Sequence, residues 1–206
     1  MQHTHYSKAP IIEAVIDLKV KPPSEESISA LENLAIGYSE RRPLMTLQGQ
    51  IQGGQSVAAT ASQAQTGYQY ISEDQKQIFQ AQQDSFTFSR LAPYQDWISF
   101  CDEAKRLWDI YVAAINPESI SRVAVRYINR LDLPLPLNDF KDYLQTVPEV
   151  SPGLPQGLSN FFLQLEIPQE DLSGTLVLNE TLIPSSSSDL ISVVLDIDLF
   201  SVDRKD

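Results

Sequence analysis

The sequence predicts an α+β fold: an antiparallel sheet with packed helices, arranged as two pseudo-symmetric strand–helix–meander halves. Apolar residues alternate along several segments, which is typical of half-buried strands. One long segment carries apolar residues at helical spacing, and the order strand, proline stop, capped helix occurs twice. The chain of 206 residues suits a single domain, with an internal repeat of halves at residues 8–117 and 118–206.

The first expected strand covers residues 10–20. Its apolar face consists of Ile12, Ala14, Ile16, Leu18 and Val20. Pro22 and Pro23 stop the strand, and Ser24 then resembles the N-cap of a helix over residues 24–35.

Residues 43–91 predict a meander of antiparallel strands, because alternating segments are separated by turn residues. The alternating Gln48, Gln50 and Gln52 suggest that one of these strands is solvated. Phe86 and Phe88 share a face, so one side of the last strand is expected to be buried.

Residues 94–115 predict the longest helix. Its apolar stripe consists of Trp97, Phe100, Cys101, Ala104, Leu107, Trp108, Tyr111 and Val112. Such a stripe is typical of a helix that packs on its sheet, and the alternative is a ligand clamp built from the two tryptophans.

The second half repeats this order with a strand over residues 119–133 and a short helix over 138–144. Strands are expected again at residues 160–167, 174–183 and 190–200. No counterpart of the helix at 94–115 follows, so we expect an uncovered sheet region and self-association or a partner protein to cover it.

Charged residues four apart form the clearest candidate site. Arg122, Arg126 and Arg130 share one face of the long central strand, while Glu13 and Asp17 share a face of the first strand. If these strands are neighbours, the charges form a cross-strand ladder. The alternative is a ligand-binding site in which the arginine row grips a phosphate or carboxylate.

Other reactive patterns are weak. Asp196 and Asp198 alternate on the last strand and could hold Mg²⁺ for nuclease chemistry, but no lysine or histidine accompanies them at diagnostic spacing. The only histidines are His3 and His5, and no phosphate-binding glycine motif is present. The sequence therefore predicts no catalytic residue, no metal site and no cofactor, and it favours a non-enzymatic role.

Charge and composition limit the kinds of partner and the cellular location that the sequence predicts. Fifteen basic against 27 acidic residues give a formal charge of −12, which disfavours non-specific nucleic-acid binding. A single cysteine, Cys101, excludes a disulfide within the chain and suits a reducing compartment. No apolar run reaches the about 20 residues of a membrane span, and Met1–His5 lacks the features of a signal peptide, so a cytoplasmic location is expected.

Two segments, Lys8–Leu18 with the letters KAPIIEAVIDL and Val125–Pro134 with VRYINRLDLP, carry a family resemblance. They are similar to a sporadically distributed prokaryotic family of uncharacterised proteins whose typical members are longer than this chain, mainly beyond Phe200. The family has no established activity, so the resemblance implies no function directly. Its patchy distribution is similar to that of host-defence genes.

The function predicted from these features is a non-enzymatic binding or assembly module that self-associates or holds a partner. One alternative is an anion or nucleotide binder of a host-defence type system that uses the arginine row. A second alternative is a metal-dependent nuclease.

Overall fold

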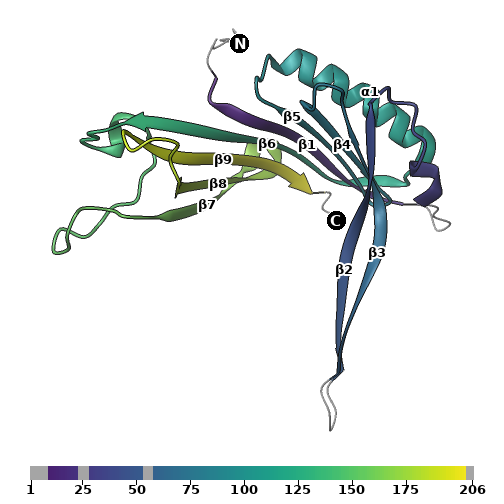
Figure 1. The fold of residues 1–206 in the computed structure, drawn as a ribbon, viewed down its shortest axis with the longest axis horizontal. Helices are drawn as coiled ribbons and strands as arrows, with labels where there is room; N and C mark the ends of the chain where they lie inside the picture. The colour runs from purple at the N-terminus through teal and green to yellow at the C-terminus, as the bar shows by residue number, and fades with distance from the viewer. Residues whose placement is uncertain (1–8, 23–27, 53–57, 203–206) are drawn as a thin grey trace. The chain divides into compact units, whose positions relative to one another are not determined.

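The computed structural model describes residues 9–22, 28–52 and 58–202, with side chains left out for residues 47–62 (Figure 1). Its strands form a nine-stranded antiparallel sheet in the order β2-β3-β4-β5-β1-β6-β9-β8-β7. The strands are β1 (Ile11–Lys21), β2 (Glu40–Gln52), β3 (Ala58–Ile71), β4 (Gln77–Gln82), β5 (Ser85–Leu91), β6 (Ser119–Pro134), β7 (Phe162–Gln169), β8 (Gly174–Ile183) and β9 (Leu190–Val202).

The predicted α+β class is wrong, because the fold is mainly β. Within the described ranges there is one α-helix, α1 (Trp97–Ile115). In the described residues of the two segments expected as short capped helices, the helical structure is limited to single 3-10 turns, η1 (Ile28–Leu31) and η2 (Phe140–Asp142). Both segments are too short to offset the free-energy cost of starting an α-helix. Their apolar side chains therefore pack from isolated turns. The expected cap Ser24 lies outside the described residues.

The strand predictions agree better with the structure. β1 and β6 each lie within one residue of the expected bounds, and the meander resolves into four strands, β2 to β5. α1 begins three residues later than expected, after the N-cap Asp96, whose Oδ1 accepts a hydrogen bond from the Ser99 amide at 2.8 Å. It ends at Ile115, and the C-cap Asn116 has the left-handed φ of 50° typical of the residue after a helix.

The chain divides into two compact units, and β1 and β6 contribute to both. The α1 unit contains residues Ile16–Arg90 and Gln95–Val123. The β7–β9 unit contains the described residues up to Val15, then Leu91–Tyr94 and Ala124–Val202. The internal repeat of two halves stays a prediction.

The core of the α1 unit is aromatic. Phe86 and Phe88 of β5 share a fully buried face, as the sequence predicts. The Phe86 ring centroid lies 5.4 Å from that of Trp108, and the Phe88 centroid lies 5.4 Å from that of Phe100. The helix stripe therefore packs on the sheet, while Trp97 at its start is 40% exposed.

The core of the β7–β9 unit is smaller and aliphatic. Leu133, Leu144 and Val193 form its buried centre. The partly buried side chains around this centre are Leu131, Leu137, Phe140, Val147, Leu182 and Ile191. The segment that contains η2 thus covers the end of the sheet where Leu182 and Val193 lie.

Candidate functional site

One arginine of the predicted row meets its predicted partner. In the α1 unit, Arg122 Nη1 lies 2.7 Å from Asp17 Oδ1. Thr87 Oγ1 donates to the other oxygen of this carboxylate at 2.8 Å. Arg122 and Asp17 are both half-buried, so this pair links β1 and β6 as a rung of the expected ladder.

In the β7–β9 unit, Arg126 pairs with Asp196 of β9. Its Nε and Nη2 atoms lie 2.7 and 2.6 Å from Asp196 Oδ1 and Oδ2. Asn179 Nδ2 donates to Asp196 Oδ2 at 3.2 Å, and Gln164 Nε2 donates to Asn179 Oδ1 at 2.8 Å. The hydrogen bonds to Asp196 raise the pKa of Arg126, and the charge of Glu13 adds to this effect. A line of polar contacts therefore crosses β6, β9, β8 and β7.

Arg130 contacts a carboxylate on its own strand. Its Nε lies 3.0 Å from Asp132 Oδ1, and Ser192 Oγ donates to the same oxygen. The hydrogen bond from Ser192, followed by that from Arg130, holds the pKa of Asp132 below its usual range. Each arginine of the row is thus engaged with an acid.

These pairs bear on the anion-binding alternative. An incoming phosphate or carboxylate would compete with Asp17, Asp196 or Asp132 for a guanidinium that is already bonded. Asp196 is 8% exposed, so removing its cation would leave a buried charge. The arrangement favours a structural role for the row, and anion binding stays a prediction.

The nuclease alternative depends on Asp196 and Asp198, which project from the same face of β9. Both oxygens of Asp196 are bonded to Arg126, so a metal ion there would have to displace the guanidinium. Among the residues that the structure describes, no group of three or more His, Cys, Asp or Glu side chains is placed to hold a metal ion. His3 and His5 lie outside those residues, and the nuclease hypothesis stays untested.

The opposite face of β7–β9 is aliphatic along most of its length and carries one acid, while Gln169 and Ser201, both opposite Gly174, form its polar end. Leu163 of β7 and Leu195 of β9 both lie directly opposite Glu180 of β8, and directly opposite residues share a face. This aliphatic face consists of Leu163, Leu165, Ile167, Leu176, Leu178, Leu182, Val193, Leu195, Ile197 and Leu199, with Glu180 among them.

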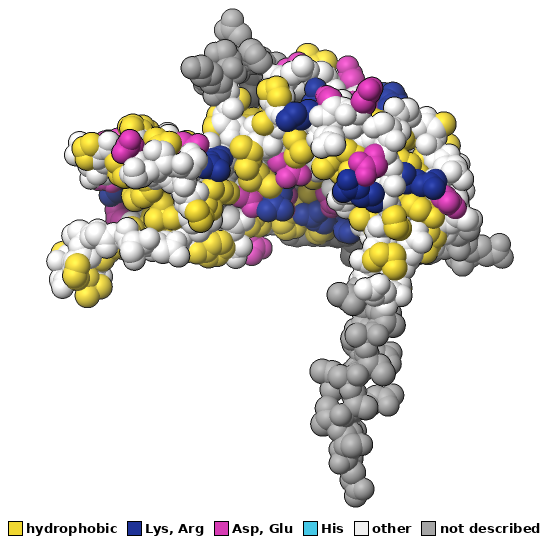
Figure 2. Space-filling model, viewed as in Figure 1, with side chains coloured by type: hydrophobic (Ala, Val, Ile, Leu, Met, Phe, Trp, Pro, Cys, Tyr) yellow, Lys and Arg dark blue, Asp and Glu magenta, His cyan; other side chains and the backbone are white. Residues whose placement is uncertain are grey.

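Most of the aliphatic face is not deeply buried. Val193, at the end covered by the η2 segment, is fully buried. Leu165, Leu178 and most of the other members are only half-buried, and Ile167 is 38% exposed. Figure 2 shows hydrophobic side chains at the surface over β7 and β8. An aliphatic sheet face in this state can bind another apolar surface.

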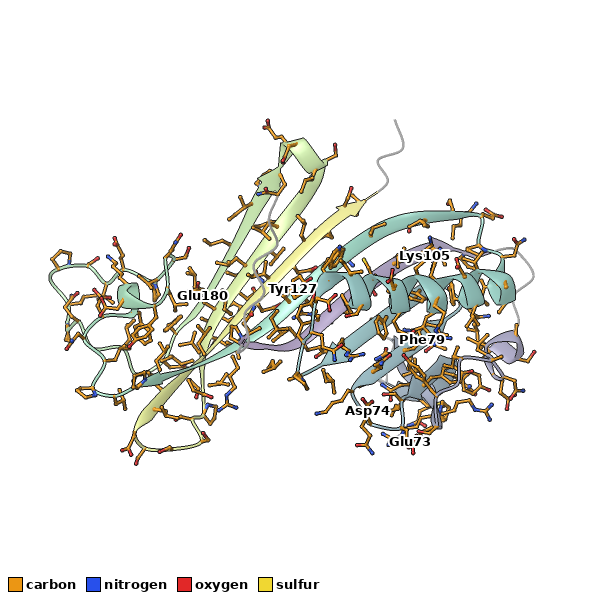
Figure 3. The ribbon with its side chains drawn as sticks, turned by 90° about the horizontal axis from the view of Figure 1, so that it is seen from above. Glu73, Asp74, Phe79, Lys105, Tyr127 and Glu180 are labelled. Atoms are coloured by element: carbon orange, nitrogen blue, oxygen red, sulfur yellow. The ribbon has the colours of Figure 1, made fainter. Side chains whose placement is uncertain are left out.

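Glu180 is the unusual member of this face (Figure 3). Its side chain is 2% exposed, and Oε2 has no hydrogen-bond partner among the described residues. Burial raises the pKa of this carboxyl above its usual value. A buried carboxyl without a donor is costly and rare, so it calls for a physical explanation.

The sequence reading did not single out Glu180, although a signal was present. In the strand expected at residues 174–183, Leu176, Leu178 and Leu182 occupy alternate positions and Glu180 falls on the same set. An acid within an otherwise apolar period of two is a local anomaly. Its burial becomes evident only when β7 and β9 supply leucines on both sides.

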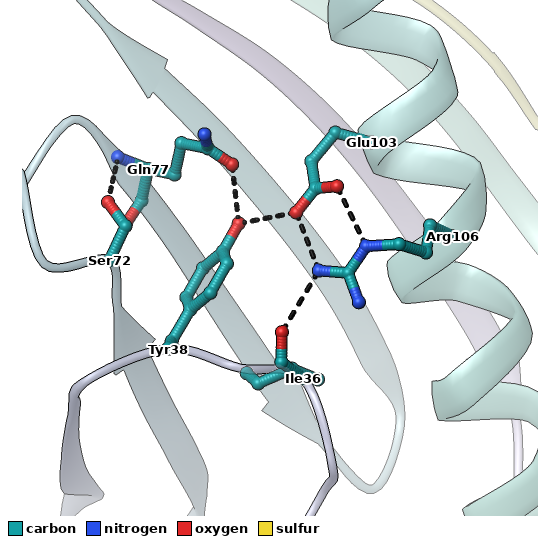
Figure 4. Close-up of polar contacts among 6 residues, drawn as sticks. All are labelled: Ile36, Tyr38, Ser72, Gln77, Glu103 and Arg106. Atoms are coloured by element: carbon teal, nitrogen blue, oxygen red, sulfur yellow. Dashed lines mark hydrogen bonds and ion pairs between the residues drawn. The ribbon is translucent and has the colours of Figure 1, made fainter.

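A second polar cluster lies in the α1 unit (Figure 4). The Tyr38 hydroxyl lies 2.7 Å from Gln77 Oε1 and 3.0 Å from Glu103 Oε1. Arg106 donates to both oxygens of Glu103, at 2.8 and 2.7 Å, and to the Ile36 carbonyl at 3.1 Å. Burial, and then the charge of Glu103, raises the pKa of Tyr38. The cluster ties the segment before β2 to β4 and α1, which is a structural task.

Comparisons with known proteins give no indication of function, so the structural features described above are the main guide to it. No protein-family model matches the chain, and neither the curated proteins nor the solved structures contain a match. Over the described part of the chain, no helix is both long and apolar enough to cross a membrane.

Proposed function

We propose that this protein is a non-enzymatic binding module that holds a partner protein against the aliphatic face of β7–β9. The observation that carries the proposal is the state of that face: its leucines and isoleucines are largely half-buried, and Ile167 is 38% exposed. Contiguous apolar surface of this kind is typical of protein interaction sites.

The polar face of the same strands has a different role, which supports the proposal. The Arg126–Asp196 pair and its extension through Asn179 to Gln164 bond the four strands to one another. A satisfied network of side-chain hydrogen bonds adds to the backbone ladder that holds these strands together. The polar face thus stabilises the unit while the aliphatic face binds.

The proposal is tested by displaying a library of random peptides of about 12 residues against the full chain, since extended or helical segments of this length occupy sheet faces and grooves. We expect peptides that bind the wild type and lose binding to Ile167→Asp, which places a charge on the aliphatic face. Thermal unfolding of both proteins checks that the variant is folded.

The matched control is Phe162→Asp. Phe162 is 67% exposed and lies on β7 like Ile167, but on the opposite face. Binding that survives Phe162→Asp and fails with Ile167→Asp supports the proposal. Binding lost only with Phe162→Asp would move the site to the other face, and a library without binders would refute the proposal.

A second candidate function, self-association, is favoured by a separate observation. β7 is the last strand in the sheet order, and no strand within the described ranges pairs with its outer edge. An edge strand can pair with the same strand of a second copy. Light scattering over a range of concentrations tests this, and a strict monomer at high concentration would exclude it.

A further inference from the structure

We propose that the aliphatic face recognises a partner segment that carries one lysine or arginine within an apolar stretch, and that Glu180 receives this cation. The inference rests on the proposed binding function and specifies the chemistry of the partner. It begins from the position of Glu180, which has Leu163 and Leu195 directly opposite and Leu178 and Leu182 next to it along β8 on the same face.

The carboxyl of Glu180 lacks what a buried carboxylate requires. It is 2% exposed and therefore has lost most of its hydration, and its Oε2 accepts no hydrogen bond in the described part of the chain. An ammonium or guanidinium group would supply both a donor and an opposite charge. Such charge-assisted hydrogen bonds are stronger than neutral ones, and an apolar environment strengthens them further.

The surrounding leucines define the rest of the partner. A free cation in water would have to lose its hydration to reach Glu180, whose nearest neighbours on this face are all leucines and cannot compensate. A cation carried on an apolar segment offsets that cost, because its neighbours bury surface against side chains such as Leu178 and Ile197. The favoured ligand is therefore a protein segment rather than a simple amine.

A second copy of this chain does not provide that cation through the same face. None of the residues that make up the aliphatic face is basic, so two copies meeting face to face would bring two Glu180 side chains together. The chain also has a formal charge of −12, which favours a basic partner over an acidic one. Charge complementarity thus selects a different protein.

The test uses the peptides that bind the wild-type face in the display experiment. A synthetic peptide with a basic residue is compared with the same peptide carrying norleucine there, which keeps the chain length and removes the charge. Affinities are measured for the wild type, Glu180→Gln and Glu180→Leu. We expect norleucine to weaken binding to the wild type by about tenfold or more and to have little effect with Glu180→Leu.

The outcomes separate this inference from the function on which it rests. Peptides that require Ile167 but contain no basic residue, or that bind equally well with norleucine, would overturn the role of Glu180 and leave the binding function standing. A library with no binder that depends on the aliphatic face would overturn both. Thermal unfolding of the Glu180 variants excludes misfolding as the cause of a lost preference.

Discussion

Arg126 and Asp196 form a two-point ion pair in which the acid is much more buried than the base. The two N–O distances are 2.7 and 2.6 Å, and the side chains are 46% and 8% exposed, respectively. The pair is therefore asymmetric, because the buried acid depends more on its partner for stabilisation of its charge than the exposed base does. Removing the arginine leaves a buried carboxylate without its cation, whereas removing the acid leaves a partly exposed cation.

Arg126→Ala should therefore destabilise the protein by about 2 kcal/mol, less than for a fully buried pair because Arg126 is partly exposed. Urea-induced unfolding measures the change in the free energy of unfolding. The control is Lys141→Ala, whose partner Glu149 is 78% exposed, and which should cost less than about 0.5 kcal/mol. Equal losses for the two variants would contradict the argument from burial.

Glu180→Gln should stabilise the protein at neutral pH. Burial raises the native pKa of Glu180 above its unfolded value of 4.5, so its favourable contribution is present below pH 4.5 and is lost as the pH rises through the native pKa. The glutamine variant has no such loss, and its advantage should reach about 1 kcal/mol or more.

The measurement for this variant is the midpoint of thermal unfolding from about pH 4 to about pH 8, compared with the wild type. The gap between the two proteins should open with rising pH and then level off. A gap that is constant over this range would mean that Glu180 does not titrate as a buried carboxyl. The change of the exposed Glu170 to glutamine is the control for the loss of one acidic side chain from the surface.

Gly67→Ala should be among the most damaging small substitutions in the chain. A Cβ atom at Gly67 would lie 2.0 Å from the Ala81 carbonyl oxygen and 2.8 Å from the Gln82 Cα, both backbone atoms of β4. Since neither can move without separating β3 from β4, a loss of about 3 kcal/mol or more is expected. Gly153→Ala, where a Cβ meets nothing within 4 Å, is the control for unfolding measurements and should be nearly neutral.

Tyr38→Phe removes the hydroxyl that contacts Gln77 and Glu103 and keeps the ring in place. The expected cost is about 1 kcal/mol, because Glu103 retains both hydrogen bonds from Arg106. Chemical denaturation measures it, with Tyr143→Phe, where the side chain is 49% exposed, as the neutral control. A loss no larger than in that control would show that the cluster does not hold the segment before β2.

The sequence predicted those elements whose signal is both long and local. The stripe that contains Phe100, Leu107 and Tyr111 recurs along the 19 residues of α1, and alternation runs along β1 and β6. The predictions of the two short helices were wrong because a few apolar residues at helical spacing fit a single 3-10 turn equally well. Leu31 of η1 is fully buried and its carbonyl accepts from the Tyr70 hydroxyl, a contact made 39 residues away.

The candidate site also shows which features local sequence patterns predict and which they do not. The spacing of Arg122, Arg126 and Arg130 along β6 predicts a shared face, since a strand alternates its side chains with a period of two. Their partners were less predictable, because Asp17 comes from β1, Asp132 from the same strand and Asp196 from β9. Spacing indicates which face a side chain occupies, but not which strand lies next to it.

By itself the sequence determined the alternation of β1 and β6, the apolar stripe of α1 and the acidic charge of the chain, because each depends on neighbouring residues or on composition. Only the tertiary structure decided the strand order and the burial of Glu180. Both depend on pairing between distant segments: Glu180 is enclosed because Leu163 and Leu195 arrive on either side of it. Hydrogen bonding along strand edges is nearly independent of side-chain identity, so many orders suit one alternating pattern until packing selects among them.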